Sequence, residues 1–298
     1  FIPSDRTEPL TFNNVGKTSS LAGKPLIVVC NDPGKKCNAV MIGGTYGMMV
    51  NPGDGSEDLE KGVVAFKNVR VESQADKALF YNDPTYWGKS FSLLIDGCTI
   101  ASYNGWSCFR SSDLGFHNIV IVDSDIIVNN PSPFTDYSSG FVSDKLVLKN
   151  NIIYNTADAA KELFFIHGNA STGSTVKFSS IEISNNTFYK VYNSASYIAL
   201  VGCSDVTGCI ALNNNLVWTT SGSFAFVHAY ANTTDLRTQL TYTGNHMCGG
   251  SMLILEGYDR IAQQGWYNNG TNFPFTKTDP VAANDFSQTM FSGCGAQR

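Results

Sequence analysis

An apolar repeat runs through the middle of the chain and constrains its fold more than any other feature. Each unit centres on one apolar or aromatic residue, and successive centres are 29, 27, 26, 35, 29 and 30 residues apart. The centres are Phe66, Ile95, Val122, Leu148, Ile183, Leu212 and Tyr242. A unit of this length cannot bury its own apolar face, so the spacing predicts a solenoid of stacked units.

Apolar residues also occupy fixed positions around each centre, which is typical of strands buried on one face. Two residues before the centres stand Val64, Leu93, Val120, Leu146, Ile181, Ile210 and Leu240. Five residues after them stand Val71, Ile100, Ile127, Ile153, Phe188, Val217 and Met247. Three residues after them the chain has Val69, Cys98, Asp125, Asn151, Asn186, Asn215 and Asn245. This last column predicts a bend between two strands, closed by a stacked asparagine ladder.

A third apolar run in most units, such as residues 197–200, indicates three strands per coil. The pattern at residues 146–153 also occurs in leucine-rich repeats, whose return segment is often helical. Here the return segment is aromatic and β-branched, which favours strands. We therefore expect an all-β fold, a right-handed, single-stranded parallel β-helix of about seven to nine coils.

The repeat also predicts the domain organisation. Residues 1–60 fit it poorly and are expected to form an N-terminal cap with degenerate coils, residues 61–258 the β-helix, and residues 259–298 a C-terminal cap. Caps are expected because bare solenoid ends would pair edge to edge with other chains. The opening FIPSDRTEPL lacks a signal peptide and is expected to begin a mature fragment of a longer chain.

Charge and hydropathy exclude two classes of partner. The formal net charge is −5 and no Lys/Arg cluster occurs, which argues against nucleic acid. No run of 18 apolar residues is present, so no membrane span is expected. We expect a monomer.

The eight cysteines fall mostly in close pairs: Cys30 with Cys37, Cys98 with Cys108, and Cys203 with Cys209, leaving Cys248 and Cys294. Cys30 and Cys37 bracket a Pro-Gly turn, which predicts a disulfide loop. The even count suits an oxidising compartment, namely the extracellular space, the cell surface or the periplasm. Buried free thiols are the alternative.

The C-terminal segment carries a family resemblance. It contains Thr278-Asp279-Pro280, Asn284-Asp285-Phe286 and Gly293-Cys294-Gly295-Ala296, and earlier units carry Asn-Asn-x-Phe/Ile-Tyr at residues 150–154 and 185–189. Over residues 64–298 the chain resembles the pectate-lyase-like parallel β-helix proteins that Bacteroidetes secrete or display. The resemblance implies this fold and a surface or extracellular setting. That group includes glycan lyases, glycan hydrolases and proteins without assigned chemistry, and the Lys and Arg motifs of an alginate or chondroitin lyase do not occur here.

Stacking places equivalent residues about 4.8 Å apart, so an outward column is a candidate site. The position after each centre holds Lys67, Asp96, Asp123 and Lys149 in successive units. Asp96 and Asp123, with Asp125 nearby, are candidate ligands of a Ca²⁺ that bridges a uronate, with Lys149 as a base. The alternative is a charge ladder that neutralises itself.

A second candidate column precedes a small residue in each unit. It contains His167, Val201, His228 and Glu256, with Arg110 in an earlier coil. His228 and Glu256 would be neighbours and could act as acid and base. Tyr230, Tyr258 and Trp106 are candidate sugar-stacking residues. The alternative is a set of polar residues that end strands.

Together these features favour a secreted or cell-surface β-helix protein that binds an extended polysaccharide or oligosaccharide, with or without catalysis. A polysaccharide lyase or glycoside hydrolase acting on a plant or host glycan is one alternative. An adhesion scaffold that binds another protein is the other. Calcium is the cofactor that the first column suggests.

Overall fold

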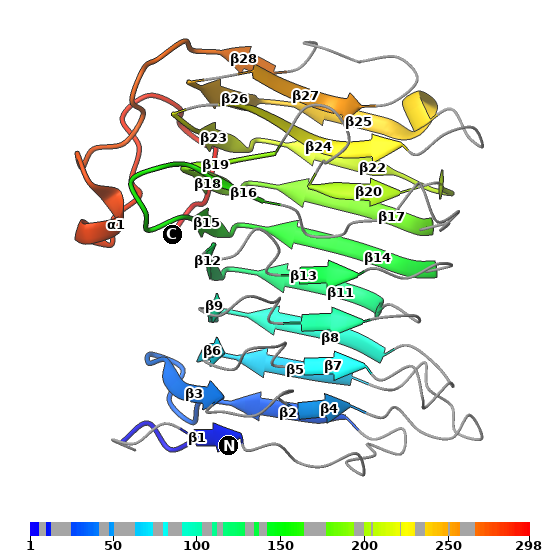
Figure 1. The fold of residues 1–298 in the computed structure, drawn as a ribbon, viewed down its shortest axis with the longest axis vertical. Coiled ribbons are helices and arrows are strands. Elements are labelled where there is room, and N and C mark those ends of the chain that lie inside the picture. The colour runs from blue at the N-terminus through cyan, green and yellow to red at the C-terminus, as the bar shows by residue number, and fades with distance from the viewer. Residues whose placement is uncertain are drawn as a thin grey trace.

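The protein is an elongated parallel β-solenoid, as the repeat predicted (Figure 1). The computed structural model describes residues 1–5, 10–12, 25–41, 48–50, 63–73, 80–82, 91–102, 109–111, 116–128, 134–136, 142–163, 177–193, 200–203, 205–220, 222–229, 236–249, 251–256 and 266–298. Within these residues every pairing between named strands is parallel. The all-β fold class is therefore confirmed.

Sheet 1 has nine strands and forms one long face of the stack. Its strands, in order, are β2 (Leu26–Val29), β5 (Val63–Lys67), β8 (Phe91–Asp96), β11 (Phe116–Val122), β14 (Val142–Lys149), β17 (Lys177–Ser184), β22 (Ile210–Asn213) and β25 (Leu240–Thr243), with β21 (Asp205–Val206) beside β17. Strand β2 thus pairs in register with the coil above it, although it lies within residues 1–60.

Sheet 2 has ten strands and forms the second face. Its strands, in order, are β1 (Leu10–Phe12), β3 (Cys37–Met41), β6 (Val69–Ser73), β9 (Thr99–Ser102), β12 (Asp125–Ile127), β15 (Ile152–Tyr154), β18 (Thr187–Tyr189), β23 (Leu216–Trp218), β26 (Asn245–Cys248) and β28 (Trp266–Asn268). Because most of these strands have only three or four residues, each exposes one or two side chains per coil on the outer face.

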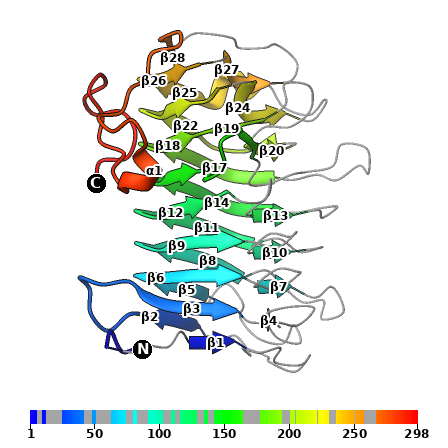
Figure 2. The ribbon, with the colours of Figure 1, turned by 60° about the vertical axis from the view of Figure 1, so that its left-hand side comes forward.

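The third face is divided into separate sheets. Figure 2 shows β4 (Met48–Val50), β7 (Phe80–Asn82), β10 (Phe109–Ser111) and β13 (Phe134–Asp136) stacked in the lower coils. The upper coils contain β20 (Val201–Cys203), β24 (Ser223–Ala229) and β27 (Ser251–Glu256). A short pair, β16 (Lys161–Glu162) and β19 (Val191–Tyr192), and a 3₁₀ helix, η3 (Leu236–Gln239), complete the coils.

The core is built from columns of identical position in successive coils. Sheet 1 contributes Phe66, Ile95, Ile121, Leu148, Ile183 and Leu212 from one column, all between 0 and 1% exposed. Sheet 2 contributes Val71, Ile100, Ile126, Ile153, Phe188, Val217 and Met247. Such columns bury the alternating apolar residues that the repeat displays.

The structure corrects the repeat at one coil. The repeat predicts Val122 as the centre of its unit, but the pairing partner of both Ile95 and Leu148 is Ile121. Ile121 is buried, whereas Val122 is only half-buried. A one-residue shift moves every side chain of a strand to the opposite face, and two adjacent apolar residues hide that shift in the sequence.

The predicted asparagine ladder is confirmed and is shifted at the same coil. The ladder consists of four fully buried residues, Asn151, Asn186, Asn215 and Asn245. The side-chain oxygens of Asn186, Asn215 and Asn245 each accept two hydrogen bonds from the asparagine one coil below, one from its backbone N–H and one from its side-chain amide. Below Asn151 the ladder position is held by Ser124, and not by Asp125 as the alignment had it.

The residue before each ladder position makes the bend. Its φ is positive: Asn68 (53°), Gly97 (63°), Asp123 (50°), Asn150 (57°), Asn185 (55°), Asn214 (54°) and Gly244 (62°). Asn, Asp and Gly adopt this left-handed conformation most readily. The bend therefore falls one residue earlier than the column that the sequence singled out.

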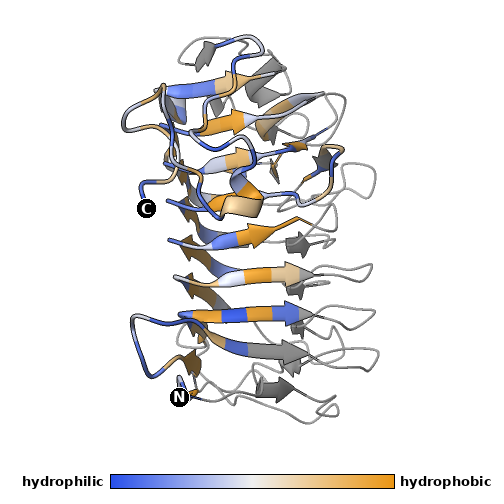
Figure 3. Ribbon diagram, turned by 90° about the vertical axis from the view of Figure 1, so that its left-hand side faces the viewer, coloured by the Kyte–Doolittle hydropathy of each residue, from blue (hydrophilic) through white to orange (hydrophobic). Residues whose placement is uncertain are grey.

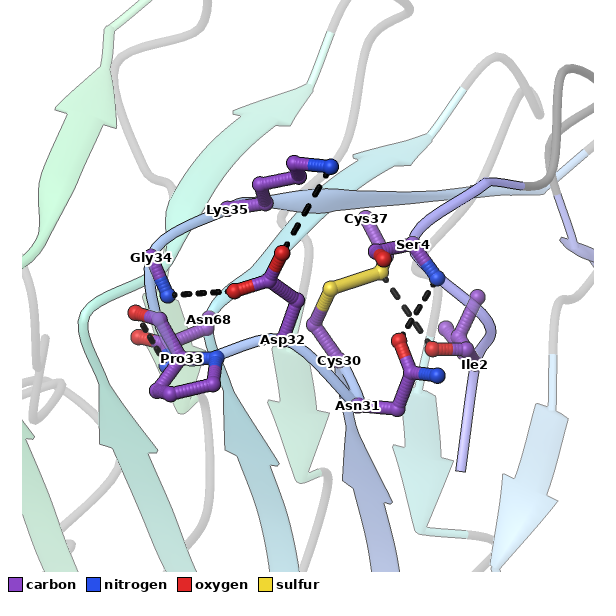
Figure 4. The surroundings of a disulfide bond; sticks show 10 residues. All are labelled: Ile2, Ser4, Cys30, Asn31, Asp32, Pro33, Gly34, Lys35, Cys37 and Asn68. Carbon is purple, nitrogen blue, oxygen red and sulfur yellow. Dashed lines mark hydrogen bonds and ion pairs between the residues drawn. A yellow bond between two sulfur atoms is a disulfide. The ribbon is translucent and has the colours of Figure 1, made fainter.

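A disulfide closes the loop before β3 (Figure 4). Cys30 and Cys37 are bonded, as predicted, with their Cα atoms 5.3 Å apart. Within the loop the Asp32 carboxylate accepts from the Gly34 N–H at 2.9 Å. Among the described cysteines Cys98, Cys203, Cys209, Cys248 and Cys294 are free, so Cys203 and Cys209 do not pair. Cys108 lies outside the described residues.

The last 30 residues lie along the flank of the solenoid (Figure 3). They contain one short helix, α1 (Pro280–Ala283), whose N-terminal N–H groups are capped by the Asp279 carboxylate. Among the described residues, no helix has the length and apolar character needed to cross a membrane.

Candidate functional site

The C-terminal tail, residues 269–298, docks on the outer face of the upper strands of sheet 2 (Figure 3). The outward side chains there are largely aromatic or apolar: Ile152, Tyr154, Tyr189, Leu216, Trp218 and Cys248. Tyr189 and Trp218 stack with ring centroids 4.9 Å apart, and Phe275 packs edge-on against Tyr189 at 5.4 Å. This contact is a second apolar cluster outside the solenoid core.

The end of the tail then descends across the bends of successive coils. Gly295 N–H donates to the Asn214 carbonyl at 2.7 Å, Ala296 N–H to the Thr187 hydroxyl at 2.9 Å, and Gln297 N–H to the Asn150 side-chain oxygen at 2.6 Å. Each step moves down the stack by one coil. Arg298 therefore lies against the coil that contains Asp123 and Asp125.

Asp125 is held between the disulfide loop and the C-terminal tail. One carboxylate oxygen accepts from Arg298 Nη2 at 2.6 Å, and the other accepts from Lys36 Nζ at 2.8 Å. Arg298 also donates to the carbonyls of Asp123 and Ser124, at 2.8 and 3.2 Å. Lys36 projects from the disulfide loop and additionally donates to the Thr99 hydroxyl at 3.0 Å. The loop and the tail thus meet at one carboxylate.

A pocket opens beside this carboxylate, between the tail and β12. Its volume is about 220 Å³ and it is lined by Asp125, Ile152, Asn284, Asp285, Phe286, Ala296 and Arg298. The Asp125 and Arg298 side chains are only 22% and 23% exposed. The side chain and backbone of Ser287 donate hydrogen bonds that hold the pKa of Asp285 below its ordinary value, and the positive charge of Lys277 lowers it further.

The lining combines two carboxylates, one guanidinium and one amide with two apolar side chains. Carboxylates accept hydrogen bonds from hydroxyl groups and a guanidinium donates them, while Phe286 and Ile152 offer apolar surface. That combination suits a small polyhydroxylated group. Within the described residues, no cluster of three or more His, Cys, Asp or Glu side chains is arranged to hold a metal ion.

Asp96 and Asp123, the predicted calcium ligands, do not occupy equivalent positions on adjacent coils. Because of the shift at Val122, the pairing partner of Asp96 is Val122 and not Asp123. Asp96 instead forms an ion pair with Lys67 at 2.5 Å, and Asp123 lies in the bend, where it accepts from the Asn150 amide. The Asp96 pair raises the pKa of Lys67 through its hydrogen bond and charge.

Lys149, the predicted base of that column, pairs with a carboxylate of the next coil. Its Nζ lies 3.6 Å from a carboxylate oxygen of Glu182, and both side chains are exposed. Two of the four predicted column residues, Lys67 and Asp96, pair with each other, Lys149 pairs with Glu182, and Asp125 belongs to the pocket on sheet 2.

The predicted acid/base neighbours are paired in the backbone. His228 of β24 and Glu256 of β27 are direct partners on adjacent coils, as the sequence predicted. On the other side His228 pairs with Gly202, so Val201 is one residue out of register. The Arg110 backbone pairs with Tyr81 and Thr135 in the lower coils. The side chains of His228, Glu256 and Arg110, and all of His167, Tyr230, Tyr258 and Trp106, lie outside the described part.

Sequence reasoning missed Lys36, Arg298 and Asp285 as site residues. Lys36 and Arg298 are 89 and 173 residues from Asp125 and stand outside the repeat, so no column contains them. Asp285 has a signal in the sequence, because it belongs to Asn284-Asp285-Phe286, one of the motifs that carry the family resemblance, but that motif indicates the fold and not a site.

The fold and the site define a class of protein: a parallel β-solenoid whose tail docks on one flank and leaves a polar pocket at its end. No family model, no curated protein and no solved structure matches this chain. The solenoid fold is compatible with a β-helix family.

Proposed function

We propose that this protein binds an extended polysaccharide along the lower part of sheet 2, with one sugar unit in the pocket beside Asp125. The observation that carries the proposal is the pocket itself, in which Asp125, Asp285 and Arg298 converge next to Phe286. Sugar hydroxyls need such paired acceptors and donors, and an apolar side chain can pack against the sugar ring.

The coils below the pocket continue the polar surface. The outward column that contains Asp125 runs downward through Thr99, Arg70 and Asn38, one residue per coil. Arg70 forms an ion pair with Glu72 at 3.1 Å, and Lys36 lies beside Thr99. Groups that repeat about every 4.8 Å fit a ligand that is itself a linear repeat.

Binding of a polysaccharide fits the expected location of the protein outside the cell. A pectate-lyase-like β-helix protein that Bacteroidetes secrete or display would meet such glycans outside the cell, where the Cys30–Cys37 disulfide is stable.

Binding is tested by affinity gels and calorimetry with neutral and uronate-containing polysaccharides. Asp285→Asn is the informative variant, because Asp285 lines the pocket but does not hold the tail to Asp125. We expect it to weaken binding at least tenfold. Asp96→Asn is the matched control, since Asp96 lies on sheet 1, and it should bind normally. Equal binding by both variants contradicts the proposal.

A glycan lyase or hydrolase is the second candidate, favoured by the direct pairing of His228 and Glu256 on adjacent coils. Release of unsaturated products or of reducing ends from the same polysaccharides distinguishes lyase and hydrolase from binding alone. If the pair is catalytic, His228→Ala abolishes turnover and retains binding at the Asp125 pocket. Turnover that survives this change excludes the pair.

A further inference from the structure

Two buried thiols lie together where the tail docks on sheet 2. Cys248 ends β26 and Cys294 lies near the end of the tail, and both belong to the apolar cluster that joins the tail to the sheet. Their exposed fractions are 0% and 3%. Among the described cysteines, the other five are not part of this cluster.

The alternation of β26 directs Cys248 toward the tail. Met247 packs in the solenoid core, so its neighbours His246 and Cys248 face outward. The His246 ring stacks on Phe291 with centroids 4.1 Å apart. His246 and Cys248 are therefore adjacent outward positions on one strand, about 7 Å apart along it.

The tail brings the sulfur of Cys294 to the same place. The Cys294 N–H donates to the Phe291 carbonyl at 3.1 Å, and the next N–H, of Gly295, donates to the Asn214 carbonyl at 2.7 Å. The Cys294 sulfur itself is hydrogen-bonded to the backbone of His246, two residues before Cys248. The Cys294 sulfur is thus held against β26, and the next residue is held against the coil below it.

We propose that Cys248 and Cys294 form a second disulfide, which ties the tail covalently to the solenoid. The chain already carries one disulfide, Cys30–Cys37, so it is suited to conditions in which thiols are oxidised. Within the described residues, Cys248 and Cys294 are the two cysteines of this cluster, and a disulfide between them requires Cα atoms about 4.4–6.8 Å apart.

The bond forms by thiol–disulfide exchange with an external disulfide, such as oxidised glutathione or an oxidised dithiol protein. One S–S bond forms in the chain, two S–H bonds break, and the two protons and two electrons reduce the external disulfide to two thiols. Burial raises the pKa of Cys248 to about 11 and that of Cys294 to about 12, so the docked thiols are protonated and unreactive at neutral pH. Exchange therefore precedes docking of the tail, and the finished bond is shielded from reductants.

Peptide mapping tests the proposal without any substitution. The chain is refolded with a mixture of reduced and oxidised glutathione, then unfolded with an alkylating reagent and digested with trypsin. Cleavage after Arg237, Arg260 and Lys277 places Cys248 in the peptide 238–260 and Cys294 in the peptide 278–298. We expect these two peptides to be joined without reductant and separate with it, while Cys203 and Cys209 are alkylated.

Recovery of both peptides as separate alkylated species, from protein in which Cys30 and Cys37 are still bonded, overturns the proposal. So does a bond from either cysteine to any other one. As a second measurement, Cys294→Ser should lower the unfolding temperature of the oxidised protein by several degrees and leave that of the reduced protein nearly unchanged. Cys203→Ser is the matched control, because Cys203 is buried and free, and its effect should be the same in both redox states.

Discussion

The upper and lower parts of the outer face of sheet 2 differ in the side chains that they expose and in whether the tail covers them. Above Asp125 the outward residues of β15, β18 and β23 include Tyr154, Tyr189 and Trp218, and the tail buries them. From Asp125 downward one of the two outward columns is polar, with Thr99 and Arg70 below Asp125, while the other holds Ile127, Ala101 and Glu72; Arg298 of the tail contacts Asp125 at the border. The two parts share the same strand geometry, so the difference comes from side-chain chemistry alone.

The interior changes at the same coil. The upper coils have asparagine in the ladder, whereas the lower ones have Ser124, Cys98 and Val69 in equivalent places. The upper coils are therefore stabilised by buried hydrogen bonds within and by an apolar cluster outside. The lower coils depend on the core and on the ion pairs around Asp125. A regular backbone can thus serve as a docking surface in one part and as a polar surface in another.

Loss of the apolar cluster should have the largest effect. Phe286 is 8% exposed and packs against Tyr154 and Tyr189, with ring centroids 5.3 and 5.6 Å away. Phe286→Ala removes these contacts and leaves a cavity, so we expect it to lower the free energy of unfolding by about 3 kcal/mol. Urea denaturation measures this. Met290→Ala, at a position 46% exposed, is the control and should change stability by less than about 0.5 kcal/mol. Similar losses for both would show that the cluster contributes little.

Removal of one ladder residue should cost somewhat less. In Asn186→Ala the Leu148 carbonyl loses the amide donor and the Asn151 backbone N–H loses its acceptor. A buried polar group without a partner costs about 1–3 kcal/mol, so we expect a loss of about 2 kcal/mol. Asn213→Ala, at an outward position one coil above, is the control. Amide hydrogen exchange should show the loosening confined to coils near residue 186, and exchange that rises equally in the lower coils would contradict the separation of the two parts.

The junction at Asp125 should contribute less still. Asp125→Asn weakens the contacts to Lys36 and Arg298, whose partial exposure screens them, and we expect a loss of about 1 kcal/mol that shrinks in high salt. Limited proteolysis should also release residues after Gly295 sooner in this variant. Asp96→Asn removes an exposed pair with Lys67 and should leave stability within error. An effect of Asp125→Asn that does not depend on salt would rule out an electrostatic junction.

The smallest effect concerns the pH dependence of the docked tail. Burial lowers the pKa of His246 below its ordinary value of 6.5, so the folded protein binds a proton less readily than the unfolded chain. Its contribution to stability is therefore complete above pH 6.5 and is lost as the pH falls from 6.5 toward the folded pKa. Unfolding curves between neutral pH and pH 5 should show this loss in the native chain and not in His246→Phe. An identical slope in both chains would assign the loss to other groups.

Much of the fold followed from the sequence because its period is a local property. Residues such as Leu93 and Ile95 alternate on one strand, and Asn186 or Asn215 stands at a fixed distance after them, so each coil can be recognised by itself. The period does not fix the register at Val122, because residues 119–122 are all apolar and their hydropathy does not distinguish the buried face of the strand. Because of that single shift, Val122 pairs with Asp96 and Asp123 lies in the bend.

The sequence by itself determined the stacked parallel coils, the ladder, the Cys30–Cys37 loop and the pairing of His228 with Glu256, since all of these depend on spacing along the chain. Only the tertiary structure decided where the tail lies and what surrounds Asp125. Lys36 and Arg298 reach that carboxylate from 89 and 173 residues away. Contacts of that range are set by which surfaces are left exposed after the coils have stacked, and no local pattern in the sequence encodes them.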